Sequence, residues 1–277
     1  TDPENFSANN VLWEFTDPDL GYGVSQPLIT RMNNGDWVAI FGNGYNSDNH
    51  RAVLFIVRLA DGKLLAKIDT GEGNAANPNG MAAPIATDWP TMNLTTNYVY
   101  AGDLQGNLWR FDLTDTNPNQ WKNANNRNIL FTAQDANGKR QPITARPSLA
   151  VNPDDNDFVV VLFGTGSYFR SQDSSDSQTQ TLYGIYDRPT TNWRVEGRDQ
   201  LLEQTIDWQE EVRVNGNDWT VRETSDKPID LSRHRGWYMD LIYRGKNHGE
   251  RVIAEATFPS SGGKPDRVRF TTLVPDD

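Results

Sequence analysis

Short apolar segments separated by polar turn residues make up most of this chain. The apolar segments are rich in Val, Ile, Phe, Tyr and Trp, and Gly, Asn, Asp and Pro bound them, a pattern typical of β-strands joined by turns. The pattern predicts strands at residues 37–41, 53–59, 98–101, 107–113, 158–163, 181–186, 237–242, 251–256 and 267–273. Together these segments indicate an all-β fold.

One part of the chain is compatible with a helix. In residues 199–211 the apolar side chains follow a helical spacing, at Leu201, Leu202, Ile206 and Trp208. The next residues, 212–222, are rich in β-formers and carry Asn-Gly-Asn-Asp at their middle. Because Asn-Gly favours the tight turn between paired strands, these residues predict a β-hairpin.

A repeat emerges when segments containing a proline after a small residue are aligned. Pro27, Pro84 and Pro147 lie 57 and 63 residues apart, and each precedes an aromatic-led strand that ends in small residues. A further strand follows, so each unit holds three or four strands in about 60 residues, as a β-propeller blade does. Small residues would prevent collisions where blades converge, and a proline at a strand start removes no ladder hydrogen bond. A β-sandwich with unrelated prolines is the alternative.

The length limits the number of such units. With 277 residues there is room for fewer than five blades of about 60 residues. We therefore expect a modified or incomplete β-propeller with long loops, forming a single domain over residues 1–277. The chain begins with Thr1 instead of Met, which predicts a fragment of a larger protein.

Composition then excludes several classes of protein. The chain has 26 Lys and Arg against 37 Asp and Glu, a net charge of −11, and it has no Cys. An acidic chain is unsuited to nonspecific binding of nucleic acid or anionic membranes. Disulfide scaffolds and thiolate chemistry are excluded. The three histidines, His50, His234 and His248, show no metal-binding spacing.

Ordered motifs now carry a resemblance to a known family. The most specific motif is residues 98–112, Tyr-Val-Tyr-Ala-Gly-Asp-Leu-Gln-Gly-Asn-Leu-Trp-Arg-Phe-Asp. The other motifs lie, in chain order, at residues 11–15, 19–21, 26–27, 35–47, 163–169, 236–241 and 249–252. Together they resemble the C-terminal β-propeller of the PilC/PilY-type type IV pilus tip adhesins, over roughly residues 11–275.

The resemblance implies a function that composition alone does not give. Members of this family sit at the pilus tip and on the outer surface of Gram-negative bacteria, so we expect an extracellular, secreted protein without enzymatic activity. The implied role is to support pilus biogenesis by opposing retraction, together with adhesion and twitching motility. The implied partners are minor pilins and a host-cell or abiotic surface, and no nucleic acid. A quinoprotein-type propeller dehydrogenase is the alternative, although its vicinal cysteine pair is absent.

The resemblance also implies a calcium loop before the strand at residues 98–101. Family members place alternate carboxylates around a glycine there, because calcium takes six to eight oxygen ligands. In this chain the ligand positions hold Trp89, Thr91, Asn93 and Asn97, Leu94 replaces the glycine, and Asp88 lies one residue early. The sequence favours a polar loop without an ion, and calcium bound by Asp88, Asn93 and Asn97 is the alternative.

Other candidates are weaker. Residues 152–157 form a second acidic loop with alternating oxygen side chains. Asp103 and Asp112 could act as an acid–base pair, but turn and strand-end hydrogen bonding is the commoner role. Four tryptophans in strand motifs predict packing between blades: Trp13, Trp37, Trp109 and Trp237. Five others lie in or near loops, where burial is favoured over a binding face: Trp89, Trp121, Trp193, Trp208 and Trp219.

Overall fold

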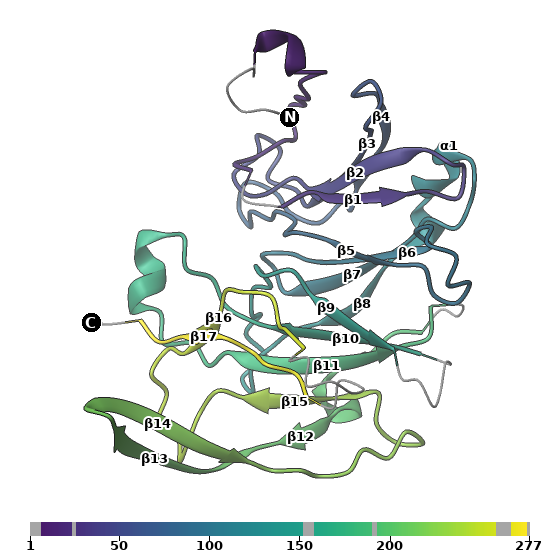
Figure 1. Cartoon of the computed structure of the whole chain (residues 1–277). Coiled ribbons are helices and arrows are strands. Elements are labelled where there is room, and N and C mark those ends of the chain that lie inside the picture. The colour runs from purple at the N-terminus through teal and green to yellow at the C-terminus, as the bar shows by residue number, and fades with distance from the viewer. Residues whose placement is uncertain (1–6, 24–25, 152–157, 190–192, 259–266, 276–277) are drawn as a thin grey trace. The chain divides into compact units, whose positions relative to one another are not determined.

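The computed structural model describes residues 7–23, 26–151, 158–189, 193–258 and 267–275. Strands account for almost all of the regular structure in these residues (Figure 1), and the predicted all-β fold is confirmed. The one α-helix in this part of the chain is a single turn, α1 (Pro118–Trp121). Short 3-10 helices lie at Ala8–Asn10, Ala124–Asn126, Ser171–Ser175 and Arg198–Gln200. Across the described residues, no helix has the length and apolar character needed to cross a membrane.

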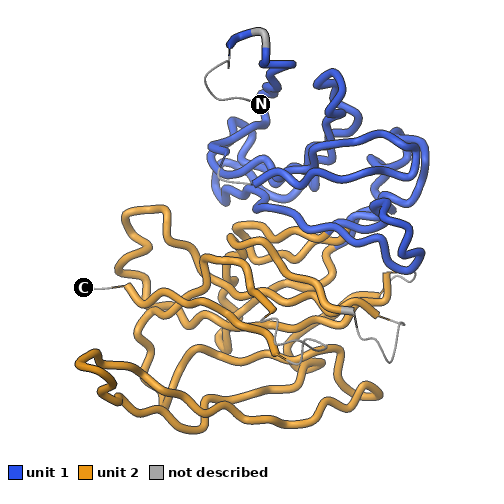
Figure 2. The backbone as a smooth tube through the Cα atoms, viewed as in Figure 1, with its two compact units in different colours: residues 1–99, 111–128 blue, residues 100–110, 129–277 orange. Residues whose placement is uncertain are grey.

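The chain divides into two compact units (Figure 2). Unit 1 contains residues 1–99 and 111–128, and unit 2 contains residues 100–110 and 129–277. Each unit is described by itself below. That residues 1–277 form a single domain stays a prediction.

The three predicted repeats each form a sheet. The first has the strand order β1-β2-β3-β4, and the second has the order β5-β6-β7-β8. The third begins with β9-β10-β11. Pro27, Pro84 and Pro147 directly precede the first strand of their repeats, as predicted. The bounds are β1 (Leu28–Arg31), β2 (Trp37–Gly42), β3 (Val53–Arg58), β4 (Leu64–Asp69), β5 (Ile85–Thr87), β6 (Tyr98–Gly102), β7 (Asn107–Asp112), β8 (Arg127–Thr132), β9 (Ser148–Val151), β10 (Val159–Gly164) and β11 (Thr181–Asp187).

The third sheet is completed by strands from much later in the chain. The strand β15 (Gly236–Asp240) pairs antiparallel with β11, and β12 (Leu202–Gln204) pairs parallel with β15. The helical reading of residues 199–211 is therefore wrong, because pairing with distant strands outweighs a weak local periodicity. The predicted strands at 251–256 and 267–273 form the short strands β16 (Arg251–Val252) and β17 (Thr272–Leu273), which pair antiparallel, and Thr257 and Arg269 add an isolated bridge.

The predicted hairpin is confirmed and is longer than expected. Its strands are β13 (Ile206–Val214) and β14 (Asn217–Thr224), which form a two-stranded sheet of their own. Asn215 and Gly216 both have positive φ, at 52° and 82°, as the tight hairpin turn requires.

Glycines at the end of each second strand explain the small residues of the repeat. A Cβ on Gly42 would lie 2.3 Å from the Ala82 carbonyl oxygen, just before the next repeat begins. A Cβ on Gly102 would lie 2.2 Å from Ile143 Cγ2, just before the third repeat. Gly164 stands in the same position of the third repeat, and a Cβ there would lie 2.3 Å from Val252 Cγ2. At all three glycines another segment approaches so closely that no room remains for a side chain, as predicted.

We expect Gly42→Ala to lower the free energy of unfolding by roughly 1–3 kcal/mol, because its methyl group would overlap backbone oxygen atoms that cannot rotate away. Chemical denaturation followed by tryptophan fluorescence measures the change. Gly23→Ala is the matched control, since nothing lies within 4 Å of a Cβ there, and it should leave stability nearly unchanged. Equal effects of the two substitutions would contradict the steric explanation.

The central strands of the repeats form the core. All but the last residue of β3 and all of β6 are buried, so both faces of these strands pack against other residues. Trp109, Trp89 and Trp121 are buried, as predicted, whereas Trp208 and Trp219 are exposed, so the burial favoured for these two is wrong. The predicted packing of Trp37 is wrong: its side chain is 56% exposed, because it opens β2 at the edge of the core.

Candidate functional site

The loop that joins β5 to β6 contains the residues predicted as calcium ligands. Asp88 directly follows β5 and is half-buried, Asn93 is exposed in the middle of the loop, and Asn97 lies at its end with its side chain buried. The structure brings Asp88 and Asn97 together through one contact, in which Asn97 Nδ2 donates to the Asp88 carbonyl oxygen at 2.9 Å. Asn93 faces the threonines on either side of it.

The amide group of Asn97 closes the loop. Its Nδ2 also lies 3.2 Å from the Trp89 carbonyl oxygen and 2.9 Å from Thr91 Oγ1. Its Oδ1 accepts a hydrogen bond of 2.9 Å from Asn33 Nδ2. Because the two carbonyl oxygens can only accept, the amide nitrogen must be the atom that faces them. A hydrogen-bond donor therefore occupies the centre of the loop.

The remaining polar atoms of the loop are also engaged with each other. Asn93 Oδ1 lies 3.0 Å from Thr91 Oγ1 and 2.7 Å from Thr95 Oγ1, and it accepts a bond of 3.2 Å from the Thr95 amide. Asp88 Oδ2 accepts from the Leu94 amide at 2.9 Å. Leu94 has φ 65°, so this position still adopts the left-handed conformation that glycine has in the family pattern.

The residues present do not fit a calcium ion. Calcium requires a shell of oxygen ligands, usually with several carboxylates, and this loop offers one carboxylate and a central nitrogen donor. Within the described ranges, no three side chains of His, Cys, Asp or Glu come close enough to hold a metal. The second candidate loop, residues 152–157, lies outside the described residues.

Asp103 supports the blade motif through hydrogen bonds. Its carboxylate is fully buried, and Oδ1 accepts from the backbone amides of Gln105 and Asn107 at 2.9 Å each. Oδ2 accepts from Asn107 Nδ2 at 2.9 Å and from Trp109 Nε1 at 2.8 Å. Asp112 bonds only Thr114 among the contacts found. Both residues thus have the structural role that was favoured for them.

A second buried carboxylate belongs to Asp187 in unit 2. Arg110 Nη1 donates to its Oδ1 at 2.6 Å, and the Tyr100 hydroxyl donates to its Oδ2 at 2.7 Å. Burial raises the pKa of Asp187 to about 6, and the charge of Arg110 and both hydrogen bonds oppose this shift. Since the carboxyl group is fully buried and both its oxygens are bonded, it is not placed to exchange protons with a substrate.

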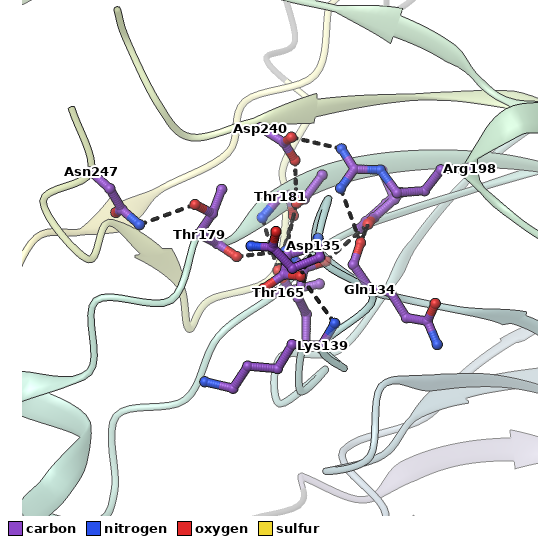
Figure 3. A network of polar contacts seen from close by, with 12 residues as sticks. Gln134, Asp135, Lys139, Thr165, Thr179, Thr181, Arg198, Asp240 and Asn247 are labelled. Carbon is purple, nitrogen blue, oxygen red and sulfur yellow. Dashed lines mark hydrogen bonds and ion pairs between the residues drawn. The ribbon is translucent and has the colours of Figure 1, made fainter. Parts of the chain in front are cut away.

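A polar network of unit 2 includes Asp240 on β15 (Figure 3). Arg198 Nη2 donates to Asp240 Oδ2 at 2.7 Å, and Thr181 Oγ1 donates to Oδ1 at the same distance. The guanidinium of Arg198 also lies 3.9 Å from the ring centroid of Tyr238. Gln141, which is fully buried, donates to the Thr181 hydroxyl at 2.7 Å. These side chains bond one another across segments distant in sequence, and this arrangement stabilises unit 2.

An all-β chain built from repeated four-stranded sheets, with a buried Asp-Asn-Trp cluster in the blade motif, defines a propeller-type domain. The sequence model of the PilY1 beta-propeller domain matches residues 5–216. The chain therefore belongs to the PilY1 β-propeller domain family. The family resemblance and the expected modified propeller are both confirmed.

Similar proteins agree with this assignment. A type IV pilus biogenesis factor PilY1 homolog from Xylella fastidiosa is 37% identical over 99% of this chain, which covers 19% of that protein. Type IV pilus biogenesis factor PilY1 from Pseudomonas aeruginosa is 35% identical over 92% of the chain, covering 24% of that protein. The crystal structure of the Pseudomonas aeruginosa PilY1 C-terminal domain matches with a TM-score of 0.81 and 32% identity, over 95% of this chain and 59% of that one.

The chain thus spans about a fifth to a quarter of the length of these relatives. Their names describe pilus biogenesis factors, so they do not favour the quinoprotein dehydrogenase alternative. Sequence reasoning missed the part that Asn33 plays in the loop before β6. It comes from the turn after β1, and no local signal connects residues so far apart.

Proposed function

We propose that this chain is the propeller part of a non-enzymatic protein of the type IV pilus. It acts outside the cell at the pilus tip of a Gram-negative bacterium, where it supports pilus biogenesis by opposing retraction. Adhesion to host-cell or abiotic surfaces and twitching motility depend on it, and minor pilins are its partners at the tip.

The observation that carries this proposal is 37% identity to a pilus biogenesis factor homolog along 99% of the chain. The structure supports the non-enzymatic part, since the buried carboxylates of Asp103 and Asp187 are saturated with hydrogen bonds. The net charge of −11 also agrees with a partner other than nucleic acid.

Deletion of the parent gene tests this function. We expect the deletion strain to lose most surface pili and to stop twitching, and a second deletion of the retraction motor to restore pili but not adhesion. Piliation is counted by electron microscopy, and twitching is measured as the zone of expansion beneath agar. A deletion strain with normal piliation and twitching would refute the proposal.

We further propose that the loop at residues 88–97 keeps its structure without a cation. The amide of Asn97 contacts Asp88, Trp89 and Thr91 at the point where family members would place the ion. Calorimetric titration of calcium into the protein should then give no saturable heat, and EDTA should leave the melting temperature unchanged. Saturable binding by the natural sequence would overturn this proposal.

Asn97→Asp supplies the contrasting result. We expect it to lower stability by roughly 2–4 kcal/mol without calcium, because a carboxylate would replace a donor in front of two carbonyl oxygens. Added calcium should recover part of this loss, measured as a rise in melting temperature. Asn93→Asp is the matched control, since Asn93 Oδ1 only accepts hydrogen bonds and a carboxylate can do the same.

A further inference from the structure

The hairpin β13–β14 exposes an apolar face to solvent. Its register places Val212 opposite Trp219 and Glu210 opposite Val221, and alternate residues of paired strands share a face. Trp219 is 58% exposed, Val221 43% and Trp208 39%. We call this set the outer hairpin face; it consists of Trp208, Glu210, Val212, Val214, Asn217, Trp219, Val221 and Glu223.

The opposite face of the hairpin anchors it to unit 2. Arg222 forms a two-point ion pair with the buried Glu250, with Nη1 to Oε1 at 2.8 Å and Nη2 to Oε2 at 2.7 Å. Arg222 Nε donates to Gln209 Oε1 at 2.8 Å across the strands. At the base, the Ser225 amide donates to the Thr205 carbonyl oxygen at 2.9 Å. Figure 1 shows the hairpin as a separate two-stranded ribbon. The anchoring contacts fix the ribbon and leave its outer face directed to solvent.

Exposed tryptophans beside exposed valines indicate an interaction surface. Clustered apolar side chains on a monomer surface indicate an interaction site, and tryptophan is enriched where binding energy concentrates. The match to the PilY1 beta-propeller domain ends at residue 216, so β13 lies within the matched range and β14 lies beyond it.

The charges on the face indicate the chemistry of the partner. Glu210 and Glu223 stand among its apolar side chains, and no ion pair of either is found within the described residues. Opposed like charges across a strand pair destabilise, and an isologous contact sets the same patch against itself. A second copy of this chain would therefore bring glutamates together. An anionic membrane surface would likewise repel them.

A protein surface with Lys or Arg around an apolar patch matches both the apolar side chains and the two glutamates of the outer hairpin face. We propose that the outer hairpin face binds a partner protein of this kind. The tryptophan and valine side chains would bury apolar area, and the two glutamates would pair with the basic rim. The proposal rests on the hairpin alone and is independent of the pilus role.

Site-specific photocrosslinking in the full-length protein tests the face. A benzoylphenylalanine replaces Trp219 or Val221 on the outer face, and Asp218 or Thr220 on the other face serves as the control. In the organism that carries the gene, we expect a covalent adduct with a different protein from the first two positions only. Mass spectrometry should map the linked partner peptide to an apolar patch with adjacent Lys or Arg. An adduct with a second copy, with lipid only, or with nothing would overturn the proposal.

Affinity measurements with the purified partner then test the chemistry. We expect Trp219→Ser to weaken binding about ten-fold or more, and Glu210→Gln with Glu223→Gln to weaken it by a similar factor at low salt. Glu211→Gln, on the opposite face, is the charge-matched control and should leave affinity unchanged. Unchanged circular dichroism and melting temperature establish that each variant folds. If Glu211→Gln weakens binding as much as a single outer-face glutamate substitution, net charge explains the effect and the proposed face is wrong.

Discussion

Asp103→Ala is expected to lower the free energy of unfolding by about 3–5 kcal/mol, because it leaves several buried donors without an acceptor. The carboxylate accepts from two backbone amides, from Asn107 Nδ2 and from Trp109 Nε1, all within 2.9 Å. The donors of Asn107 and Trp109 cannot turn to water, since both residues are buried. Urea denaturation followed by tryptophan fluorescence measures the loss.

Two further variants separate this explanation from a general sensitivity of the motif. Asp103→Asn keeps one acceptor oxygen but presents an amide nitrogen to the other donors, so its cost should lie between those of the wild type and the alanine variant. Asp112→Ala, at the other end of the same motif, removes only the contacts to Thr114 and should cost less than about 1 kcal/mol. Comparable losses at the two aspartates would show that the buried hydrogen bonds are not the cause.

The repeat could be predicted because its causes are local in sequence. A proline that opens a strand and a glycine that ends the next one need no knowledge of distant partners. Pro84 and Gly102, for example, fulfil these roles where the sequence placed them. The aromatic and β-branched residues between such positions then define strands that are buried on both faces.

The end of the third repeat could not be predicted because its partners are distant. Gly236 pairs with Ile185 across about fifty residues, and the parallel strand β12 has no turn connecting it to β15. Local spacing in residues 199–211 matched a helix, yet pairing with β14 and β15 decides their conformation. Strand pairing of this kind leaves no short-range signal.

At the candidate site, too, the sequence could not predict contacts between distant residues, here at the level of single atoms. The sequence shows that Asn97 stands where the family pattern has a carboxylate, which indicates a loss of charge. Whether the amide offers its oxygen or its nitrogen to the loop depends on the groups around it. The nitrogen faces the carbonyl oxygens of Asp88 and Trp89, and the amide oxygen accepts from Asn33, which is more than sixty residues away.

Arg251 is the site of the second large effect that we expect. Its side chain is 1% exposed, and all the acceptors found for its guanidinium are backbone carbonyl oxygens. Nε donates to Gly249 at 2.8 Å, Nη1 donates to Ser167 at 3.0 Å and to Asp173 at 2.7 Å, and Nη2 donates to Asp176. One side chain of β16 therefore bonds four times to backbone carbonyls, three of them in the segment of residues 167–176, which contains the 3-10 helix Ser171–Ser175.

Arg251→Met should cost about 3–5 kcal/mol, because methionine fills the volume but leaves buried carbonyl oxygens without donors. Arg251→Lys should be intermediate, since an ammonium has three hydrogens and cannot span acceptors arranged around a planar guanidinium. Arg213→Met is the control: its charge is exposed, and the loss of stability should be below about 1 kcal/mol.

Hydrogen exchange then shows whether the loss of stability in Arg251→Met is local or global. If Arg251 acts on the segment it contacts, amides of residues 167–176 should exchange faster in Arg251→Met than those of β10 and β11. Uniform acceleration across unit 2 would instead mean that Arg251 stabilises the sheet as a whole.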